Sequence, residues 1–162
     1  MKCTEIRAEW ETDTDPDLSW LGEYKASEPR GENYIDCKLG LMFVTGEDEP
    51  VRGDLPTWRD GREYRYFVSC NYAHSTDASD LDAFAEDYKR MRDYNDGQWD
   101  MQYCSAVATI TFESERGEMT ENEYSSGLGG IESDCGRDYQ KEVEAEQIAE
   151  LQESLKKQGI IF

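Results

Sequence analysis

Carboxylate side chains outnumber basic ones by more than two to one in this sequence. The 162 residues include 37 Asp and Glu against 17 Lys and Arg, which gives a formal net charge of −20 at pH 7. A disordered acidic segment would carry similar charge but few aromatic residues, whereas this chain contains 10 Tyr, 5 Phe and 4 Trp. We therefore expect a folded protein with a strongly acidic surface.

The length of the chain favours one compact domain, because domains commonly contain about 100 to 200 residues. We predict a single acidic domain over residues 1–162. The five cysteines are odd in number, widely spaced and without a C-x-x-C pair, so neither a disulfide framework nor a zinc site is expected. The N-terminus, MKCTEIRAEW, has no apolar core of a signal peptide, and we expect a protein of the reducing cytoplasm of a host cell.

Alternating and helical periodicities predict the elements of this domain. Strands are expected at 4–10, 34–44, 62–69 and 99–112, with a short fifth strand at 119–124. Amphipathic helices are expected at 78–95, with Asp77 or Ser79 as N-cap, and at 138–158. This order of elements predicts an α+β fold, in which a mostly antiparallel sheet of four to five strands carries two amphipathic helices packed on one face.

Three further expectations concern loops and the core. Residues 46–60 are rich in Gly, Pro and acids and are expected to form a long surface loop. Residues 126–130, S-G-L-G-G, lack the Lys-Ser/Thr ending of a phosphate loop, so we expect a tight turn there. The buried stripe of the last helix is expected to comprise Tyr139, Val143, Ile148, Leu151 and Leu155.

The residue types that most enzymes use are scarce. The one histidine, His74, lies just before the first helix, and we interpret it as an exposed loop or cap residue with no cysteine partner that the sequence identifies. We therefore expect a protein that is not an enzyme and needs no cofactor.

Two groups of carboxylates could be mistaken for metal sites. Asp13, Asp15 and Asp17 are spaced like the start of a calcium loop, but Leu18 occupies the position that requires glycine. Three acids precede the last helix, and we interpret them as favourable partners of the helix dipole, with a metal-dependent hydrolase as the alternative: Glu132, Asp134 and Asp138. The sequence thus predicts no metal site.

Carboxylates form stripes on both expected helices. On the last helix they fall at i, i+4, i+8 and i+11, with neighbours roughly 5 to 6 Å apart, which resembles the spacing of phosphates along a nucleic-acid strand: Glu142, Glu146, Glu150 and Glu153. The first helix carries a shorter stripe, interrupted by Arg90: Asp82, Glu86 and Asp93. We predict that these seven residues bind the partner.

These stripes favour a nucleic-acid mimic. Like charges at i, i+4 destabilise a helix, and a rigid array of carboxylates could compete for a basic groove that binds phosphates. The expected partner is therefore a basic nucleic-acid-binding protein or complex of the host, blocked without catalysis. The alternative is that both stripes are solvated faces, partly neutralised by pairs such as Glu86 with Arg90 and Glu153 with Lys157.

A second functional interpretation is an accessory protein that binds a protein partner through an aromatic patch, with the acid serving solubility. Trp20, Trp58 and Trp99 are the candidate anchors, because aromatic residues dominate interface hot spots. Salt distinguishes the two interpretations, since mimicry should weaken steeply as ionic strength rises.

Three segments resemble a family of small proteins of unassigned function that phages and mobile elements encode. They are A-E-W-E-T-D-T-D-P-D-L-S-W-L-G-E-Y (8–24), G-R-E-Y-R-Y-F-V (61–68) and G-L-G-G-I-E-S-D (127–134). The resemblance supplies no catalytic motif. It implies a setting in which small acidic proteins counter host defences, including as anti-CRISPR or antirestriction DNA mimics.

Overall fold

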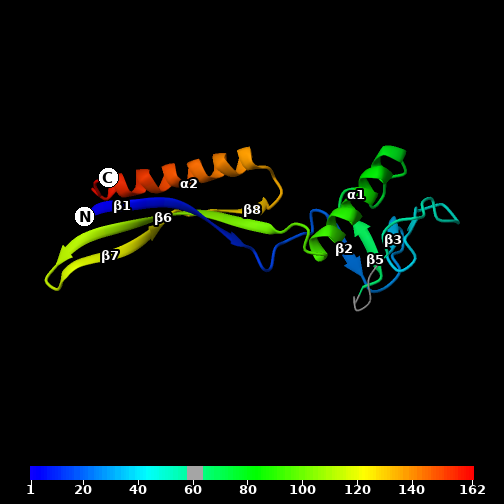
Figure 1. Ribbon diagram of the computed structural model, residues 1–162. Coiled ribbons are helices and arrows are strands. Elements are labelled where there is room, and N and C mark those ends of the chain that lie inside the picture. Colours follow the sequence, from blue (N-terminus) through cyan, green and yellow to red (C-terminus); the bar gives the residue numbers. More distant parts are fainter. Residues whose placement is uncertain (58–63) are drawn as a thin grey trace. The chain divides into compact units, whose positions relative to one another are not determined.

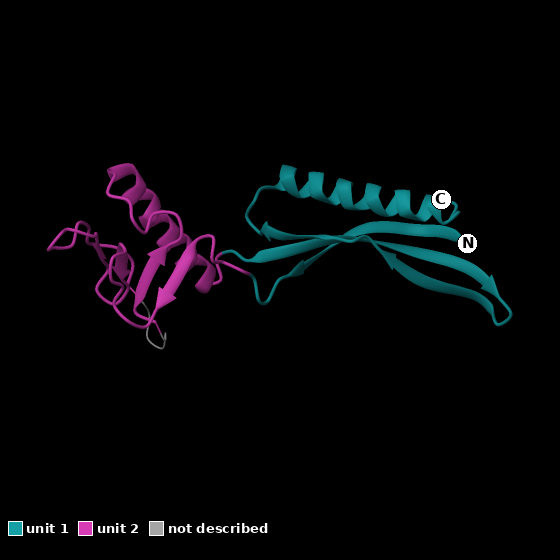
Figure 2. Ribbon diagram, turned by 180° about the vertical axis from the view of Figure 1, so that it is seen from behind, with its two compact units in different colours: residues 1–16, 99–162 teal, residues 17–98 magenta. Residues whose placement is uncertain are grey.

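The chain is arranged as two compact units, which Figure 2 shows in different colours. A computed structural model describes residues 1–57 and 64–162. Unit 1 comprises Met1–Pro16 and Trp99–Phe162, and unit 2 comprises Asp17–Gln98, so unit 2 is inserted between the two segments of unit 1. Each unit contains one helix and one four-stranded antiparallel sheet, which confirms the α+β class with antiparallel strands. The single acidic domain expected over residues 1–162 stays a prediction.

Unit 1 is built around one long central strand (Figure 1). Its elements are β1 (Lys2–Thr12), β6 (Met101–Ser114), β7 (Gly117–Tyr124), β8 (Leu128–Glu132) and α2 (Arg137–Lys157). One edge of β6 pairs with β1, while β7 and β8 pair with successive parts of its other edge. All of these pairings are antiparallel. The whole of unit 2 therefore lies between β1 and its partner strand β6 in the sequence.

Helix α2 covers one face of this sheet and lies along β1 and β6 in Figure 1. Leu151 and Leu155 pack against Ala106, Ala108 and Ile110 of β6, whose alternate positions face the helix. Full burial of each leucine contributes about 2 kcal/mol to folding. The alanines leave room for the close approach of the helix.

The buried stripe of α2 differs from the prediction at one end. Val143, Leu151 and Leu155 are buried as expected, but Tyr139 is 46% exposed. Gln147 is buried instead, and its side-chain oxygen accepts a hydrogen bond of 2.7 Å from the Ser125 hydroxyl. A polar residue therefore occupies the stripe because a second polar group satisfies it there.

Unit 2 contains the remaining elements. They are β2 (Gly22–Lys25), β3 (Tyr34–Asp36), β4 (Leu41–Phe43), β5 (Tyr66–Ser69) and α1 (Ala78–Asn95), with the sheet order β2-β5-β3-β4. The bounds of α1 match the prediction. The strand expected at 62–69 is found as β5, and the start of that range, residues 62–63, lies outside the described residues. The sequence did not indicate β2.

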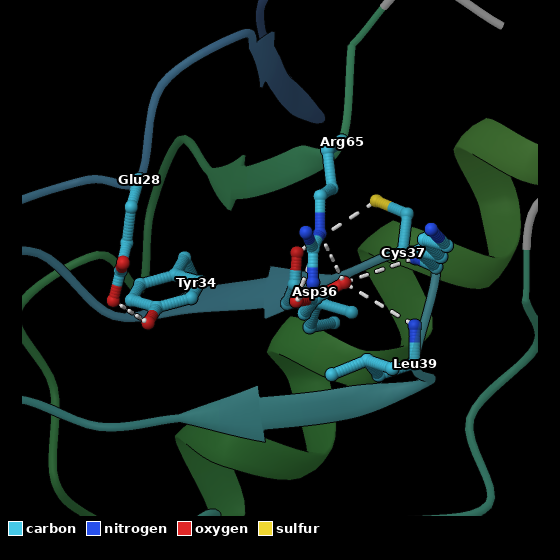
Figure 3. A network of polar contacts seen from close by, with 8 residues as sticks. Glu28, Tyr34, Asp36, Cys37, Leu39 and Arg65 are labelled. Carbon is cyan, nitrogen blue, oxygen red and sulfur yellow. Dashed lines mark hydrogen bonds and ion pairs between the residues drawn. The ribbon is translucent and has the colours of Figure 1, made fainter.

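The prediction of a single strand at 34–44 is wrong. The segment forms two strands, β3 and β4, because Asp36 ends β3 and starts a turn. Its carboxylate accepts hydrogen bonds from the backbone N–H groups of Lys38 (3.1 Å) and Leu39 (3.2 Å), a pattern typical of Asp-initiated turns. The guanidinium of Arg65 donates to the same buried carboxylate, with Nη2 2.7 Å from Oδ2 (Figure 3). Leu41 then begins β4, which pairs back onto β3.

The core of unit 2 joins β5 to α1 through aromatic rings. The ring of Phe67 lies 6.1 Å from that of Phe84 and 5.5 Å from that of Tyr88, between centroids. Ser69 follows Phe67 by two positions on β5. Its hydroxyl donates a 2.6 Å hydrogen bond to the carboxylate of Asp87 on α1. Burial of this carboxyl raises the pKa of Asp87, and the Ser69 hydrogen bond opposes the shift.

A buried asparagine connects three loops of unit 2. The Nδ2 group of Asn33 donates to the carbonyl oxygens of Tyr72 (3.1 Å) and Ser75 (2.5 Å), and its Oδ1 accepts from the N–H of Thr45 (2.9 Å). The backbone N–H of Asn33 also donates to the Ala73 carbonyl at 2.6 Å. Every polar group of this fully buried side chain thus has a partner, as buried amides require.

Two corrections concern unit 1. The strands expected at 99–112 and 119–124 extend further toward each other, since β6 ends at Ser114 and β7 begins at Gly117, which confines the turn between them to two residues. The tight turn expected at 126–130 overlaps β8, which pairs with β6 across a register shift between Gln102 and Cys104. Glycine suggested a turn here, but the phenol of Tyr103 covers the chain at this point and favours residues without a side chain.

The N-cap of α1 makes stability depend on pH. The Asp77 carboxylate accepts hydrogen bonds from the hydroxyl (2.8 Å) and the N–H (2.9 Å) of Ser79, and these lower the pKa of Asp77. A lowered folded-state pKa means that the stabilisation is present above the ordinary Asp value, about 3.9, and is lost as pH falls through the folded-state pKa. We expect Asp77→Ala to lower Tm at pH 7, with the difference shrinking below about pH 4.

Thermal unfolding followed by circular dichroism from pH 2.5 to 7 would measure this difference. Asp93→Ala is the matched control, because Asp93 lies in the last turn of α1, where a carboxylate does not favour the helix dipole. Equal losses of Tm in both variants at pH 7 would contradict the capping role.

Candidate acidic interface

The carboxylate stripe of α1 is largely compensated by cations. Asp82 forms an ion pair with Arg52, and the Glu86 carboxylate lies 3.3 Å from the Lys89 ammonium. The pair of Glu86 with Arg90 stays a prediction. Asp93 is exposed, and it lines a surface cavity together with Lys89. These pairs reduce the negative potential of α1, so this helix is the weaker of the two candidate contact faces.

The row on α2 is less compensated. Glu142 and Glu146 are exposed and have no ion-pair partner among the residues that the structure describes. Glu153 lies 2.8 Å from the Lys157 ammonium, as predicted, and both side chains are more than two-thirds exposed. At Glu142 and Glu146 no ion pair within the described residues offsets the negative charge, so both carboxylates are open to contact with a basic partner.

Glu150 is held in place by a segment 24 residues away. Its Oε1 accepts hydrogen bonds from the hydroxyl (2.6 Å) and the backbone N–H (3.1 Å) of Ser126. The bond from the hydroxyl is the main cause of a lowered pKa of Glu150. The carboxylate is therefore both ionised at neutral pH and fixed in orientation, and it marks the side of α2 that faces the segment after β7.

The strand β7 extends this acidic surface. Glu121 pairs with Ile110 and Glu123 with Ala108, and paired residues of antiparallel strands point to the same face. Because Ile110 and Ala108 face α2, the two glutamates lie on the helix side of the sheet. We call the resulting set the acidic flank: Glu142, Glu146 and Glu150 of α2 with Glu121 and Glu123 of β7.

The carboxylates of β7 were not among the site residues predicted from the sequence. The signal was present, because residues 113–123 contain five glutamates against one arginine. Unit 1 as a whole carries 19 Asp and Glu against 7 Lys and Arg, while unit 2 carries 18 against 10. The uncompensated charge is thus concentrated in unit 1. The stripe of α1 belongs to unit 2 and that of α2 to unit 1.

The aromatic anchors of the alternative interpretation differ in accessibility. Trp99 is 3% exposed and belongs to the core, whereas Trp20 is 42% exposed. Trp58 lies outside the described residues. Of the two anchors that the structure describes, Trp20 is therefore the one at the surface.

His74 lies at a cavity rather than at an isolated surface position. It is exposed, and it lines a cavity of about 290 Å³ in unit 2 together with Cys70 and the ion pair between Lys25 and Glu32. The structure thus brings a thiol and an imidazole to one cavity, an arrangement that was not predicted from the sequence. The cysteine is four residues before the histidine, and the turn between them places both at this cavity.

The carboxylates considered as metal ligands do not form a cluster. Within residues 1–57 and 64–162, no three His, Cys, Asp or Glu side chains come together in an arrangement that could hold a metal ion. This applies to Glu132, Asp134 and Asp138 and also to Asp13, Asp15 and Asp17. One carboxylate oxygen nearby, Oδ1 of Asp100, is buried without a hydrogen-bond partner.

Compared with protein-family models, curated proteins and solved structures, the chain matches none of them. In the part of the chain that the structure describes, neither helix combines the length and the apolar character needed to cross a membrane.

Proposed function

We propose that this chain binds a basic, nucleic-acid-binding protein or complex of a host cell through the acidic flank and blocks it without catalysis. It would act in the cytoplasm as a mimic of nucleic acid, in the manner of an anti-CRISPR or antirestriction protein. The observation that carries the proposal is the row of uncompensated carboxylates on α2, which continues onto β7 and is anchored by Ser126 at Glu150.

The geometry gives this row the regularity that a phosphate-binding groove recognises. Successive carboxylates on α2 are separated by about 6 Å along the helix axis, and those on β7 by about 7 Å along the strand. Basic grooves gain much of their affinity from phosphate contacts and the release of counterions. A fixed row of carboxylates can take the place of phosphates in those contacts, and it lacks the scissile bonds of a nucleic acid.

Neutralising the row on α2 should weaken binding strongly. We expect the triple variant Glu142→Gln, Glu146→Gln, Glu150→Gln to lose at least about tenfold in affinity for the captured partner, since each charge-assisted contact is worth about 1 kcal/mol or more. Glutamine at position 150 can still accept the hydrogen bonds from Ser126. The partner would be captured from host lysate at low salt, identified by mass spectrometry, and its affinity measured by calorimetry.

The matched control removes the same number of charges elsewhere. Glu47, Asp48 and Glu49 are exposed in a loop of unit 2, and the variant Glu47→Gln, Asp48→Asn, Glu49→Gln has the same net charge as the α2 variant. Binding by the control should match the unmodified protein. Equal weakening in both variants would show that net charge alone drives binding, and a complex that survives high salt would favour an aromatic interface.

A further inference from the structure

We propose that the outer edge of β7 accepts an extended, basic segment of the partner as an additional β-strand. This inference rests on the proposed function and adds how the partner is held: by backbone pairing with β7 beside the acidic flank.

Half of the backbone groups of β7 point away from its one partner strand. The N–H of Ser125 donates to the Ala106 carbonyl at 2.9 Å, so the position directly after β7 bonds to β6. Alternate residues of a strand direct their N–H and C=O groups to opposite edges. The residues that point outward are therefore Glu118, Thr120, Asn122 and Tyr124.

This edge is regular and unobstructed within the described residues. The eight pairs between β6 and β7 run without a register shift, from Val107 with Tyr124 to Ser114 with Gly117. The strand contains no proline, lysine or bulge, three devices that commonly block an edge, and the charged side chains that it does carry are all glutamates. The opposite edge of the sheet differs, because β1 has a register shift after Cys3 and its start pairs with Ile161.

The glutamates of β7 determine which kind of strand can pair with its outer edge. Glu118 lies on the open face of the sheet, while Glu121 and Glu123 lie on the face of α2, so an added strand would have carboxylates beside it on both faces. Opposite charges on neighbouring strands stabilise their pairing and like charges oppose it. A second copy of β7 would bring glutamates against glutamates. A segment in which Lys or Arg recurs is the occupant that complements both faces.

Proline at an outward position tests this pairing. The N–H of Thr120 is not used by β6, so Thr120→Pro removes an outward donor while leaving the hairpin bonds in place, and Thr120→Ala keeps the donor. The probe is a nine-residue peptide of alternating lysine and threonine. We expect it to bind Thr120→Ala like the unmodified protein and Thr120→Pro at least tenfold more weakly, by calorimetry at low salt.

A second measurement uses the unmodified protein and does not depend on the folding of a variant. Amide exchange followed by NMR should slow at least tenfold at Glu118, Thr120, Asn122 and Tyr124 when the peptide is bound. The same peptide with alternate backbone nitrogens methylated keeps its charge but cannot pair, and it should bind at least tenfold more weakly. Equal affinity of the two peptides, or no protection at the outward amides, would overturn the proposal.

The outcomes separate this inference from the proposed function. If neutralising the α2 row abolishes capture of the host partner while Thr120→Pro leaves it unchanged, the acidic flank stands and edge pairing is refuted. If Thr120→Pro abolishes capture and the α2 variant does not, edge pairing is supported and the proposal that the acidic flank mimics nucleic acid is refuted. Protection of the outward amides in the protein alone, with a dimer in light scattering, would assign the edge to a second copy and overturn the proposal.

Discussion

Replacing Asn33 with alanine is expected to cost unit 2 about 4 kcal/mol of unfolding free energy. The substitution removes three hydrogen bonds that a fully buried side chain makes with part-buried backbone groups: the carbonyls of Tyr72 and Ser75 and the N–H of Thr45. Each unsatisfied buried group costs about 1 to 3 kcal/mol. Asn33→Asp should cost more, because it places a carboxylate against two carbonyl oxygens.

Urea unfolding followed by hydrogen exchange, resolved by segment, would measure this effect. Asn71→Ala is the matched control, because Asn71 lies in the same turn region but is exposed, and its loss should change the free energy by less than about 0.5 kcal/mol. A cost below about 1 kcal/mol for Asn33→Ala would contradict the role of this side chain. Simultaneous loss of protection in both units would support the predicted single cooperative domain.

Adding one methyl group at Gly127 is expected to destabilise unit 1 by about 3 kcal/mol. A Cβ atom there would lie 1.9 Å from the Tyr103 hydroxyl oxygen and 2.1 Å from its ring carbon Cζ. The backbone of Gly127 also has φ of +77°, which alanine adopts at a cost. Tyr103 would have to leave its position, and with it the 2.6 Å hydrogen bond that it donates to the Ser126 carbonyl.

Gly130→Ala separates the two contributions. Gly130 has a similar φ of +72° but no atom within 4 Å of the added methyl group, so only the backbone cost of about 1 kcal/mol applies. Chemical unfolding monitored through α2 would compare the variants. Equal costs at the two glycines would show that the Tyr103 ring moves aside freely. Because Ser126 also holds Glu150, we further expect Gly127→Ala to weaken binding by the acidic flank.

The elements with strong periodicity were predicted well from the sequence. Helix α1 was predicted at its observed bounds, because the apolar spacing and the Asp77 cap agree. The long strand β6 was recognised from its β-branched alternation, and α2 was placed within one residue at each end. These signals come from neighbouring residues in the sequence, and tertiary contacts changed the bounds of these elements little.

The misses arose where a tertiary contact outweighed the local pattern. Gly127 and Gly129 suggested a turn, but both lie close to the side chain of Tyr103, which is more than 20 residues earlier in the chain. The local sequence pattern does not show that contact. The break between β3 and β4 follows from the Asp36 carboxylate, which bonds to the turn and to Arg65. Alternation alone could not show that this aspartate turns the chain.

The candidate site was predicted in part. Glu142 and Glu146 are exposed on one row of α2 as the periodicity indicated, but the anchoring of Glu150 by Ser126 could not be read from the sequence. The stripe of α1 was overestimated, because the partner of Asp82 is Arg52 from a distant loop. The contribution of β7 depends on its register with β6, which places Glu121 and Glu123 on the helix side.

The insertion of unit 2 within unit 1 imposes an order of events on the ribosome. Thr12, at the end of β1, pairs with Gln102, so on the order of 90 residues must be translated before β1 can meet β6. At about 5 to 20 residues per second, the strand waits several seconds without a partner. Unit 2 is contiguous in sequence and can fold during that interval. The charged residues that alternate along β1, Glu5, Arg7 and Glu9, would keep the waiting strand from premature association.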